Sequence, residues 1–324
     1  MNTIFSVIIP IYNSENYIEK CLNSVLFQDM NNYEILCVND GSTDRSLQIL
    51  NKYAQNDSRI KIINTQNKGT SHARNEGIKQ SKGDYLLFLD SDDYFYYSSA
   101  FSNLYKIIQQ SSQEVECIYF PGGCETPTWS GQEKYQSQKF QTGWECLLEH
   151  CNKKKILVFG SVYVQCYKKS VLIDNNIFFE ENLLYAEDRL FVIKYFFYCK
   201  YTVVFPDPIY CYVVHENSVM TTKNPERRII DNLLFSELAY SFIFQHNLKD
   251  KAIKKYINGF YISAVAEKYK YSKKININKK ILFNTSVNFK KLFQSILITI
   301  HPTLYIKYKY IANFILEKIN IFKR

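Results

Sequence analysis

Residues 85–93 read Tyr-Leu-Leu-Phe-Leu-Asp-Ser-Asp-Asp, an unbroken apolar run that ends in three acids within four positions. A short apolar run that follows Gly83 and ends in a polar cluster predicts a strand buried on both faces, as in a parallel sheet. Open α/β sheets bind ligands at the carboxyl ends of their strands, where Asp90, Asp92 and Asp93 would then lie. Carboxylates this close repel one another, so one should have a raised pKa unless a cation lies among them. The stretch favours Mg²⁺ or Mn²⁺ with open positions for phosphate oxygens, although an isolated pattern of this kind is more often a solvated acidic turn that caps a helix.

The segments before this run alternate between strand-like and helix-like patterns with short connections. We expect strands at residues 4–10, 33–38, 59–64 and 85–89, and helices at residues 14–26, 43–53 and 70–83. Ser14 is the expected N-cap of the first helix, and Ser42 or Thr43 that of the second. This alternation predicts an α/β fold with a doubly wound, mostly parallel sheet flanked by helices.

The pattern is less regular after Asp93. Helices are expected at residues 98–112, 186–198, 225–244 and 250–269, and strands at 115–120, 157–166 and 201–205. Residues 121–142 are rich in Gly, Pro, Ser, Thr and Gln and predict a long exposed loop. Long loops of this kind commonly have a binding role.

Composition places the chain among globular proteins. It has 324 residues, 46% of them hydrophobic, and an odd number of cysteines, nine, without a C-x-x-C pair. Reduced, buried thiols in a cytoplasmic protein are therefore expected, in place of a disulfide framework or a zinc site. The N-terminus lacks the basic region of a signal peptide, and no stretch of about 18 uncharged apolar residues predicts a spanning helix.

Charge is unevenly distributed along the chain. Residues 251–324 carry 16 Lys or Arg and two acids, a net charge of +14, whereas residues 1–250 carry a net charge of −5. Residues 302–322 form an aromatic, Lys-containing segment that suits either an anionic membrane surface or ordinary amphipathic packing on the main domain. Lys and Tyr together could also bind nucleic acid, but no recognition motif accompanies them, so we expect no nucleic-acid partner.

Two further motifs would lie beside the acidic run. The first, residues 39–44 (Asn-Asp-Gly-Ser-Thr-Asp), follows the second strand; Asp40 could accept a hydrogen bond from a pyrimidine N–H or a ribose hydroxyl, or the motif could be plain turn chemistry. The second, residues 73–77, places Arg74 near the start of a helix. Its guanidinium could pair with Asp90 or with a phosphate, or it could be a surface arginine.

The N-terminal part of the chain resembles the family 2 glycosyltransferases of the GT-A fold. The resemblance rests on the opening strand at residues 6–13, the loop at 39–44, the pattern Asn-x-Gly…Ala-Arg-Asn-x-Gly at 67–77, and the D-x-D run at 89–93. It implies a GT-A, Rossmann-like sheet with a helical C-terminal extension. It also implies a nucleotide-sugar site, with Asp40 on uracil, Asp90 on ribose or metal and Asp92 on metal. The nucleotide-binding residues that it implies are Pro10, Tyr12, Asn13, Glu15, Asp40, Arg74, Asp90 and Ser91.

Members of this family carry a Glu-Asp pair further along, and residues 185–191 (Tyr-Ala-Glu-Asp-Arg-Leu-Phe) resemble it. The resemblance implies that Asp188 is the catalytic base and Glu187 its neighbour; without it, the acids would suit a helix N-terminus. Ala186 replaces the family's usual Gly, which we take as a minor departure. His215 resembles a residue that ligates the metal or contacts the diphosphate, although a lone His is as often structural.

These inferences predict an inverting, metal-dependent glycosyltransferase that uses a nucleotide-diphosphate sugar, a UDP-sugar in first place, with Mn²⁺ or Mg²⁺. The acceptor would be a glycan or a lipid-linked glycan in surface polysaccharide synthesis, for capsule or lipopolysaccharide. We expect a catalytic domain at residues 1–220 and a basic helical region at 221–324, in a cytoplasmic protein peripheral to the membrane. The alternatives are a nucleotidyltransferase, which would need a Gly-rich basic loop that residues 10–14 lack, and a non-catalytic protein that binds anionic ligands.

Overall fold

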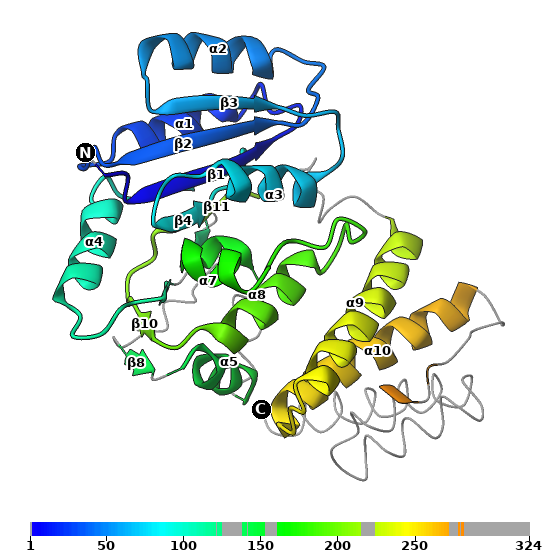
Figure 1. Ribbon diagram of the computed structural model, residues 1–324. Coiled ribbons are helices and arrows are strands. Elements are labelled where there is room, and N and C mark those ends of the chain that lie inside the picture. Colours follow the sequence, from blue (N-terminus) through cyan, green and yellow to red (C-terminus); the bar gives the residue numbers. More distant parts are fainter. Residues whose placement is uncertain are drawn as a thin grey trace, which may run out of the picture. The chain divides into compact units, whose positions relative to one another are not determined.

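The computed structural model describes residues 2–120, 122–124, 138–140, 142–152, 161–214, 224–271, 278 and 280–281 (Figure 1). The chain divides into two compact units, residues 1–223 and residues 224–324. The first unit contains the central sheet, and the second contains two long helices.

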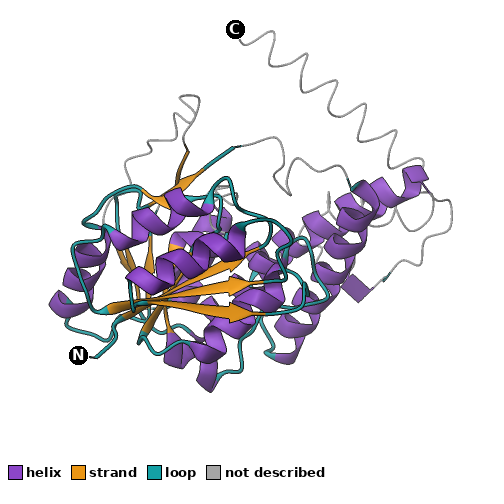
Figure 2. Cartoon of the chain, turned by 90° about the horizontal axis from the view of Figure 1, so that it is seen from above, coloured by secondary structure: helices purple, strands orange, loops and turns teal. Residues whose placement is uncertain are grey.

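The first unit opens with the predicted alternation of strands and helices. Strands β1, β2 and β4 are buried at every position, because helices pack on both sides of the sheet, as Figure 2 shows. The strands pair in the parallel order β3-β2-β1-β4. The elements are β1 (Phe5–Ile11), α1 (Ile18–Leu26), β2 (Tyr33–Asn39), α2 (Ser46–Asn56), β3 (Ile60–Asn64), α3 (Thr70–Gln80) and β4 (Tyr85–Phe88).

The sheet continues beyond β4 with a change of direction. Strand β9 (Gln165–Lys168) lies antiparallel between β4 and β6 (Cys117–Tyr119). Next come β10 (Thr202–Val204), parallel to β6, and β8 (Gln138–Phe140), antiparallel to β10. The eight-stranded sheet is therefore mostly parallel, as predicted. A smaller sheet joins β5 (Tyr94–Phe95), β11 (Tyr210–Tyr212) and β7 (Gly122–Cys124).

Two of the remaining elements of the first unit, α4 (Ala100–Gln110) and α8 (Glu187–Tyr198), lie where helices were predicted. The others were not predicted: α5 (Gly143–Asn152), the 3₁₀ turn η1 (Val162–Val164), which lies within the strand expected at 157–166, and α7 (Lys169–Asp174). Helix α3 packs closely on β1, because a Cβ at Gly77 would lie 2.4 Å from Cγ2 of Ile8. The apolar side chains of β1 and of the inner face of α1 are fully buried and form the core next to the site.

Several local predictions were wrong. Ser14 does not cap α1, which begins at Ile18, because the Ser14 hydroxyl bonds with Ser91 and with the carbonyl of Tyr12 instead. Neither Ser42 nor Thr43 caps α2, which begins at Ser46. Part of the strand expected at 157–166 lies outside the described residues, and the described part is strand only from Gln165. The predicted loop at 121–142 contains β7 and β8, and its other residues lie outside the described ones apart from position 142.

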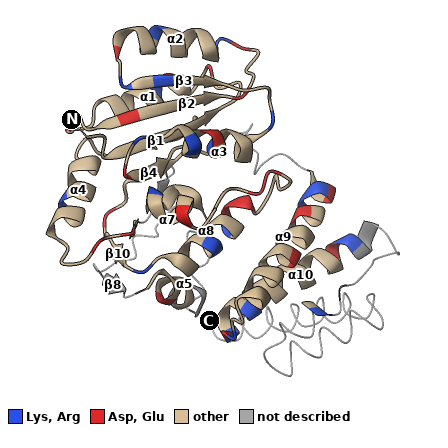
Figure 3. Ribbon diagram, viewed as in Figure 1, with Lys and Arg blue, Asp and Glu red and all other residues tan. Residues whose placement is uncertain are grey.

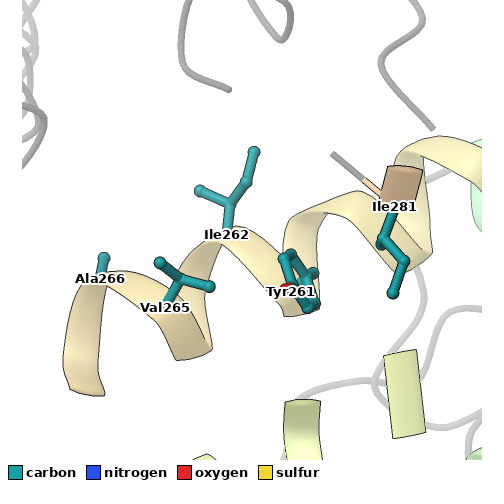
Figure 4. Packing of buried hydrophobic residues seen from close by; sticks show 5 residues of the cluster. All are labelled: Tyr261, Ile262, Val265, Ala266 and Ile281. Carbon is teal, nitrogen blue, oxygen red and sulfur yellow. The ribbon is translucent and has the colours of Figure 1, made fainter. Parts of the chain in front are cut away.

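The second unit contains α9 (Pro225–Gln245) and α10 (Lys251–Tyr271), at the positions predicted for helices. Helix α9 begins at a cap, where the backbone N–H of Arg227 donates to Asn224 Oδ1. Figure 4 shows a buried apolar cluster of the second unit. Leu233 and Tyr240, which are partly buried, pack against it. The cluster consists of Tyr261, Ile262, Val265, Ala266 and Ile281. The predicted segment 302–322 lies outside the described residues.

Two predictions drawn from composition can be compared with the described part of the chain. None of its helices is both long enough and apolar enough to cross a membrane. The cysteines whose side chains are described are all buried free thiols, as expected for a chain without a disulfide framework. They are Cys21, Cys37, Cys117, Cys146, Cys166, Cys199 and Cys211.

Candidate active site

The loops at the carboxyl ends of β1, β2 and β4 are joined by side-chain hydrogen bonds. The hydroxyl groups of Ser14 and Ser91 lie 2.6 Å apart, which joins the loop after β1 to the acidic loop after β4. The backbone N–H of Ser14 donates to Ser46 Oγ over 2.8 Å, which joins the same loop to α2. Parallel strands end at one edge of the sheet, so these loops form one surface there.

Of the residues predicted to bind the nucleotide, Asn13 and Glu15 hold the loops together through hydrogen bonds, whereas Tyr12 is exposed. Asn13, in the left-handed region at φ 50°, accepts the backbone N–H of Thr43 at 2.8 Å, so it shapes the loop. Glu15 Oε2 accepts from the backbone N–H and the Nε–H of Arg45, both at 3.0 Å, and the backbone bond lowers the pKa of Glu15. Pro10 is buried within β1, whereas the ring of Tyr12 is 48% exposed and available to a ligand.

Asp40 follows β2 and is buried against the loop that leads into α3. Its Oδ1 accepts from the Thr65 hydroxyl at 2.6 Å and the Lys68 N–H at 2.9 Å, and its Oδ2 accepts from the Gly69 N–H at 2.6 Å. Gly69 has a φ of 95°, a conformation that favours glycine, and α3 begins at the next residue. A carboxylate offers about four acceptor positions, so these bonds leave about one for a ligand.

Arg74 connects the two acidic motifs. Its side chain is buried, and its guanidinium pairs with Asp90 Oδ1 at 2.8 Å and with Asp188 Oδ1 at 2.7 Å, while Glu187 Oε1 lies 3.4 Å away. Asp90 was one of the two partners predicted for Arg74. Figure 3 shows acidic residues at the start of α8 and basic residues on α3. A single cation therefore brings the loop after β4 and the start of α8 together.

Glu187 and Asp188 are both largely buried beside Arg74, and burial raises the pKa of each. Burial, followed by the charge of Asp188, raises the pKa of Glu187 to about 8. Burial also raises the pKa of Asp188, and Arg74 opposes that rise. The Glu187 and Asp188 side chains are still 16% and 18% exposed, so a ligand can reach them. The backbone N–H of Val162 donates to Asp188 Oδ2 at 3.2 Å and fixes its orientation.

Ala186, which stands where the family usually has Gly, lies in the left-handed region at φ 68°, immediately before α8. A residue with a Cβ costs about 1–2 kcal/mol in that conformation, whereas glycine adopts it freely. The chain therefore tolerates backbone strain at the residue that precedes Glu187 and Asp188.

Asp93 and Tyr210 are members of the site whose pairing the sequence did not predict. The Tyr210 hydroxyl and the backbone N–H of Val213, the latter at 2.7 Å, donate to the buried carboxyl of Asp93. Burial, followed by the charges of Asp90 and Asp92, raises the pKa of Asp93 to about 8. A raised pKa at one of these acids was predicted from the sequence. The sequence does not show which acid is buried, so it could not assign the raised pKa to Asp93.

The described part of the chain offers few carboxylates for a metal ion. In the described ranges no group of three or more His, Cys, Asp or Glu side chains is placed to hold one, and His215 lies outside them. Mg²⁺ usually takes one or two carboxylates and fills its other positions with water and substrate phosphates. The partly exposed Asp92, with Asp90, fits that requirement, and the nearness of three carboxyl groups at positions 90, 92 and 93 favours a cation there.

The order and direction of the strands define the GT-A fold. The model of the family described as Glycosyl transferase family 2 matches residues 6–172, about half of the chain, and the chain belongs to this family. It is therefore a glycosyltransferase, which decides against the nucleotidyltransferase and the non-catalytic alternatives.

Two relatives are similar in sequence. The uncharacterized glycosyltransferase EpsJ of Bacillus subtilis is 30% identical over 250 residues, which cover 76% of this chain and 71% of EpsJ. The poly(ribitol-phosphate) beta-N-acetylglucosaminyltransferase TarS of Staphylococcus aureus is 34% identical over 212 residues, which cover 64% of this chain and 35% of TarS.

Two solved structures show the same fold. TarS 1–349 of S. aureus in complex with UDP-GlcNAc superposes with a TM-score of 0.69 at 23% identity, over 95% of this chain and 92% of that one. The mannosyltransferase PcManGT of Pyrobaculum calidifontis, in complex with GDP-Man and Mn²⁺, gives a TM-score of 0.55 at 14% identity, over 95% and 87%.

Proposed function

We propose that the chain transfers a sugar from a UDP-sugar to a hydroxyl of a glycan or lipid-linked acceptor, with inversion at the anomeric carbon, in surface polysaccharide synthesis. The UDP-GlcNAc held by TarS and the GDP-Man held by PcManGT support a nucleotide-sugar donor. The poly(ribitol-phosphate) in the name of TarS supports a polymeric acceptor.

The observation that carries this proposal is the double pairing of Arg74 with Asp90 and Asp188. Inverting transfer needs a leaving diphosphate on one side of the anomeric carbon and a base on the other. Asp90 belongs to the acidic loop on the proposed donor side, and Asp188 begins the helix on the proposed acceptor side. The guanidinium holds these groups within one site, as a single displacement requires.

In this mechanism Asp188 is the base. The acceptor oxygen bonds to the anomeric carbon, its proton passes to the Asp188 carboxylate, and the bond from the anomeric carbon to the diphosphate oxygen breaks with its electron pair on the diphosphate. The charge of Arg74 lowers the pKa of Asp188 against the rise that burial causes, which favours the carboxylate that a base requires, and the Val162 N–H holds its second oxygen. Burial and the charge of Asp188 raise the pKa of Glu187, which favours a proton on Glu187 when Asp188 is the carboxylate.

The donor would bind along the loops at the carboxyl edge. Asp40 would use its remaining acceptor position for the uracil N–H, and Tyr12 would contact the base with its exposed ring. Pro10, Asn13, Glu15 and Ser91 would shape the loops around the nucleotide. Asp92, with Asp90 and His215, would hold Mn²⁺ or Mg²⁺, whose chemistry is to neutralise charge on the leaving diphosphate.

Two substitutions test these roles. Asp92→Ala and Asp188→Asn are each expected to abolish transfer, and only Asp92→Ala should weaken the binding of UDP in the presence of Mn²⁺. The wild-type chain is first assayed for Mn²⁺-dependent hydrolysis of UDP-GlcNAc, UDP-glucose and GDP-mannose, and UDP binding is measured by calorimetry. Asp207→Asn, an exposed acid in the same unit, is the matched control and should retain activity. Wild-type activity in either test variant would remove the role assigned to that residue.

We also propose that residues 251–324 bind an anionic membrane surface at the cytoplasmic face. Their net charge of +14 supports this, because each Lys or Arg near such a surface contributes about 1 kcal/mol. Flotation with anionic vesicles should recover the protein, and flotation with neutral vesicles should not. Equal recovery from both, or stronger retention on a nucleic-acid column than on anionic vesicles, would contradict it.

A further inference from the structure

Asn75 follows Arg74 on α3 and binds the backbone of a distant segment through its side-chain amide. Its Nδ2 donates to the carbonyl of Phe179 at 3.0 Å, and its Oδ1 accepts the N–H of the same residue at 2.8 Å. The same Nδ2 also donates to Glu181 Oε1 at 3.0 Å. Asn75 is buried, so both backbone groups of Phe179 find their partner in this single side chain.

Phe179 in turn lies among the groups that form the site. Its ring stacks on Phe191 of α8, with centroids 4.0 Å apart and planes 7° apart. The guanidinium of Arg74 lies 5.3 Å from the Phe179 centroid, and the ring also meets Phe88 edge-to-face, immediately before the acidic loop. The ring therefore contacts Arg74, α8 and the end of β4.

We propose that Asn75 is a positioning residue for the transfer step. It fixes the backbone at Phe179, and through that ring it sets the place of Arg74 relative to α8 and Asp188. The inference rests on the proposed function, in which Asp188 is the base. Adjacent residues of α3 thus hold the α8 region twice, Arg74 through the Asp188 side chain and Asn75 through the backbone before it.

The isosteric variant Asn75→Asp tests this role. Its carboxylate can still accept the Phe179 N–H but cannot donate to the Phe179 carbonyl or to Glu181. Because a displacement of about 1 Å can cost about 100-fold in rate, we expect kcat to fall about 10- to 100-fold. The KM for the UDP-sugar that the wild type hydrolyses fastest should change less than about threefold, because the Asn75 side chain bonds to Phe179 and Glu181 and not directly to the donor loops. Rates are normalised to the number of UDP sites measured by calorimetry.

The matched control is His72→Gln. His72 lies on the same helix, and its Nδ1 is 3.1 Å from Glu181 Oε2, so the variant changes an exposed contact with the segment that contains Phe179. We expect His72→Gln to have the kcat and KM of the wild type. An equal loss in His72→Gln and Asn75→Asp would show a general need for this segment and would overturn the specific role of Asn75.

A double-mutant cycle with Phe179→Leu separates positioning from simple destabilisation. If Asn75 acts through the Phe179 ring, the loss of kcat in the double variant should not exceed that of the more impaired single variant. Independent losses that multiply, or a fall in kcat that matches a rise in KM, would overturn the proposal.

Hydrogen exchange gives a readout that does not depend on activity. In Asn75→Asp the amides of residues 179–190 should exchange at least about tenfold faster than in the wild type, and in His72→Gln they should not. Unchanged exchange and unchanged kcat in Asn75→Asp would refute the inference while Asp188→Asn stays inactive. Activity in Asp188→Asn would instead refute the proposed function.

Discussion

Replacing Arg74 with lysine keeps the positive charge but removes the planar fork that pairs with Asp90 and Asp188 together. A lysine ammonium is a single point on a flexible stem, so it can hold one of these carboxylates well but not both. Hydrogen bonds to charged groups contribute about 1.5–3 kcal/mol each. We therefore expect Arg74→Lys to lower the free energy of unfolding by about 2–3 kcal/mol at pH 8 and to lower kcat about 100-fold.

The loss should depend on pH in a defined direction. Arg74 opposes the rise in the pKa of Asp188 and Glu187, so weakening its pairing moves both pKa values further above those of the unfolded chain. A carboxyl group whose pKa is higher in the folded than in the unfolded protein binds more protons in the folded state. Its contribution to the free energy of unfolding is therefore lost as the pH rises from the unfolded pKa to the folded pKa. The deficit of the variant should be smaller at pH 5.5 than at pH 8, by about 1 kcal/mol or more.

Urea denaturation of both proteins at pH 5.5 and 8 measures this difference. Arg45→Lys is the stability control, because its pair with Glu15 is exposed and a surface pair contributes at most about 1 kcal/mol. An identical deficit at the two pH values would refute the electrostatic reasoning. Wild-type kcat in Arg74→Lys would refute the need for the fork.

Two further predictions concern strain and charge near the same site. Ala186→Gly should raise the free energy of unfolding by about 0.5–1 kcal/mol, because relief of the left-handed strain outweighs the entropy that glycine adds to the unfolded chain; a lower melting temperature would contradict this. The pKa of Asp93 is about 8 in the folded protein, above its value in the unfolded chain, so Asp93 destabilises the wild type increasingly between about pH 4 and 8. Asp93→Asn lacks this carboxyl, so the difference in melting temperature between the variant and the wild type should increase in favour of the variant from pH 5 to pH 8. The same pH dependence in both proteins would show that the pKa of Asp93 is not raised by folding.

The strands of the N-terminal half were predictable because burial on both faces leaves a clear mark. Residues 5–11 and 33–39 are buried at every position, and such strands read as continuous apolar runs between polar loops. The C-terminal part of the sheet was harder to predict, since β6, β9 and β10 are only three or four residues long. Their pairing depends on contacts between distant segments, which periodicity does not report.

The candidate site shows the same division between local and distant information. Arg74, Asp90 and Asp188 stand in recognisable motifs, and the parallel sheet makes the pair of Arg74 with Asp90 predictable. The pair of Arg74 with Asp188 joins residues 114 positions apart and was not predicted. Asn75 stands in one of the same motifs, but its bonds to Phe179 join residues 104 positions apart. The cap predicted at Ser14 failed because Ser91, also distant in sequence, binds its hydroxyl. Local sequence preferences therefore fail to predict a cap where the polar side chain forms a hydrogen bond with a residue distant in sequence.

The reversed direction of β9 has a consequence for how this enzyme could diversify. Because β9 runs against β4 and β6, it is the beginning of β9 that reaches the edge where the parallel strands end. The chain entering β9 thus delivers Val162 to Asp188, beside loops that leave β1, β2 and β4. Substitutions at residues 161–164 can therefore change the surroundings of Asp188 without altering the loops that leave β1, β2 and β4.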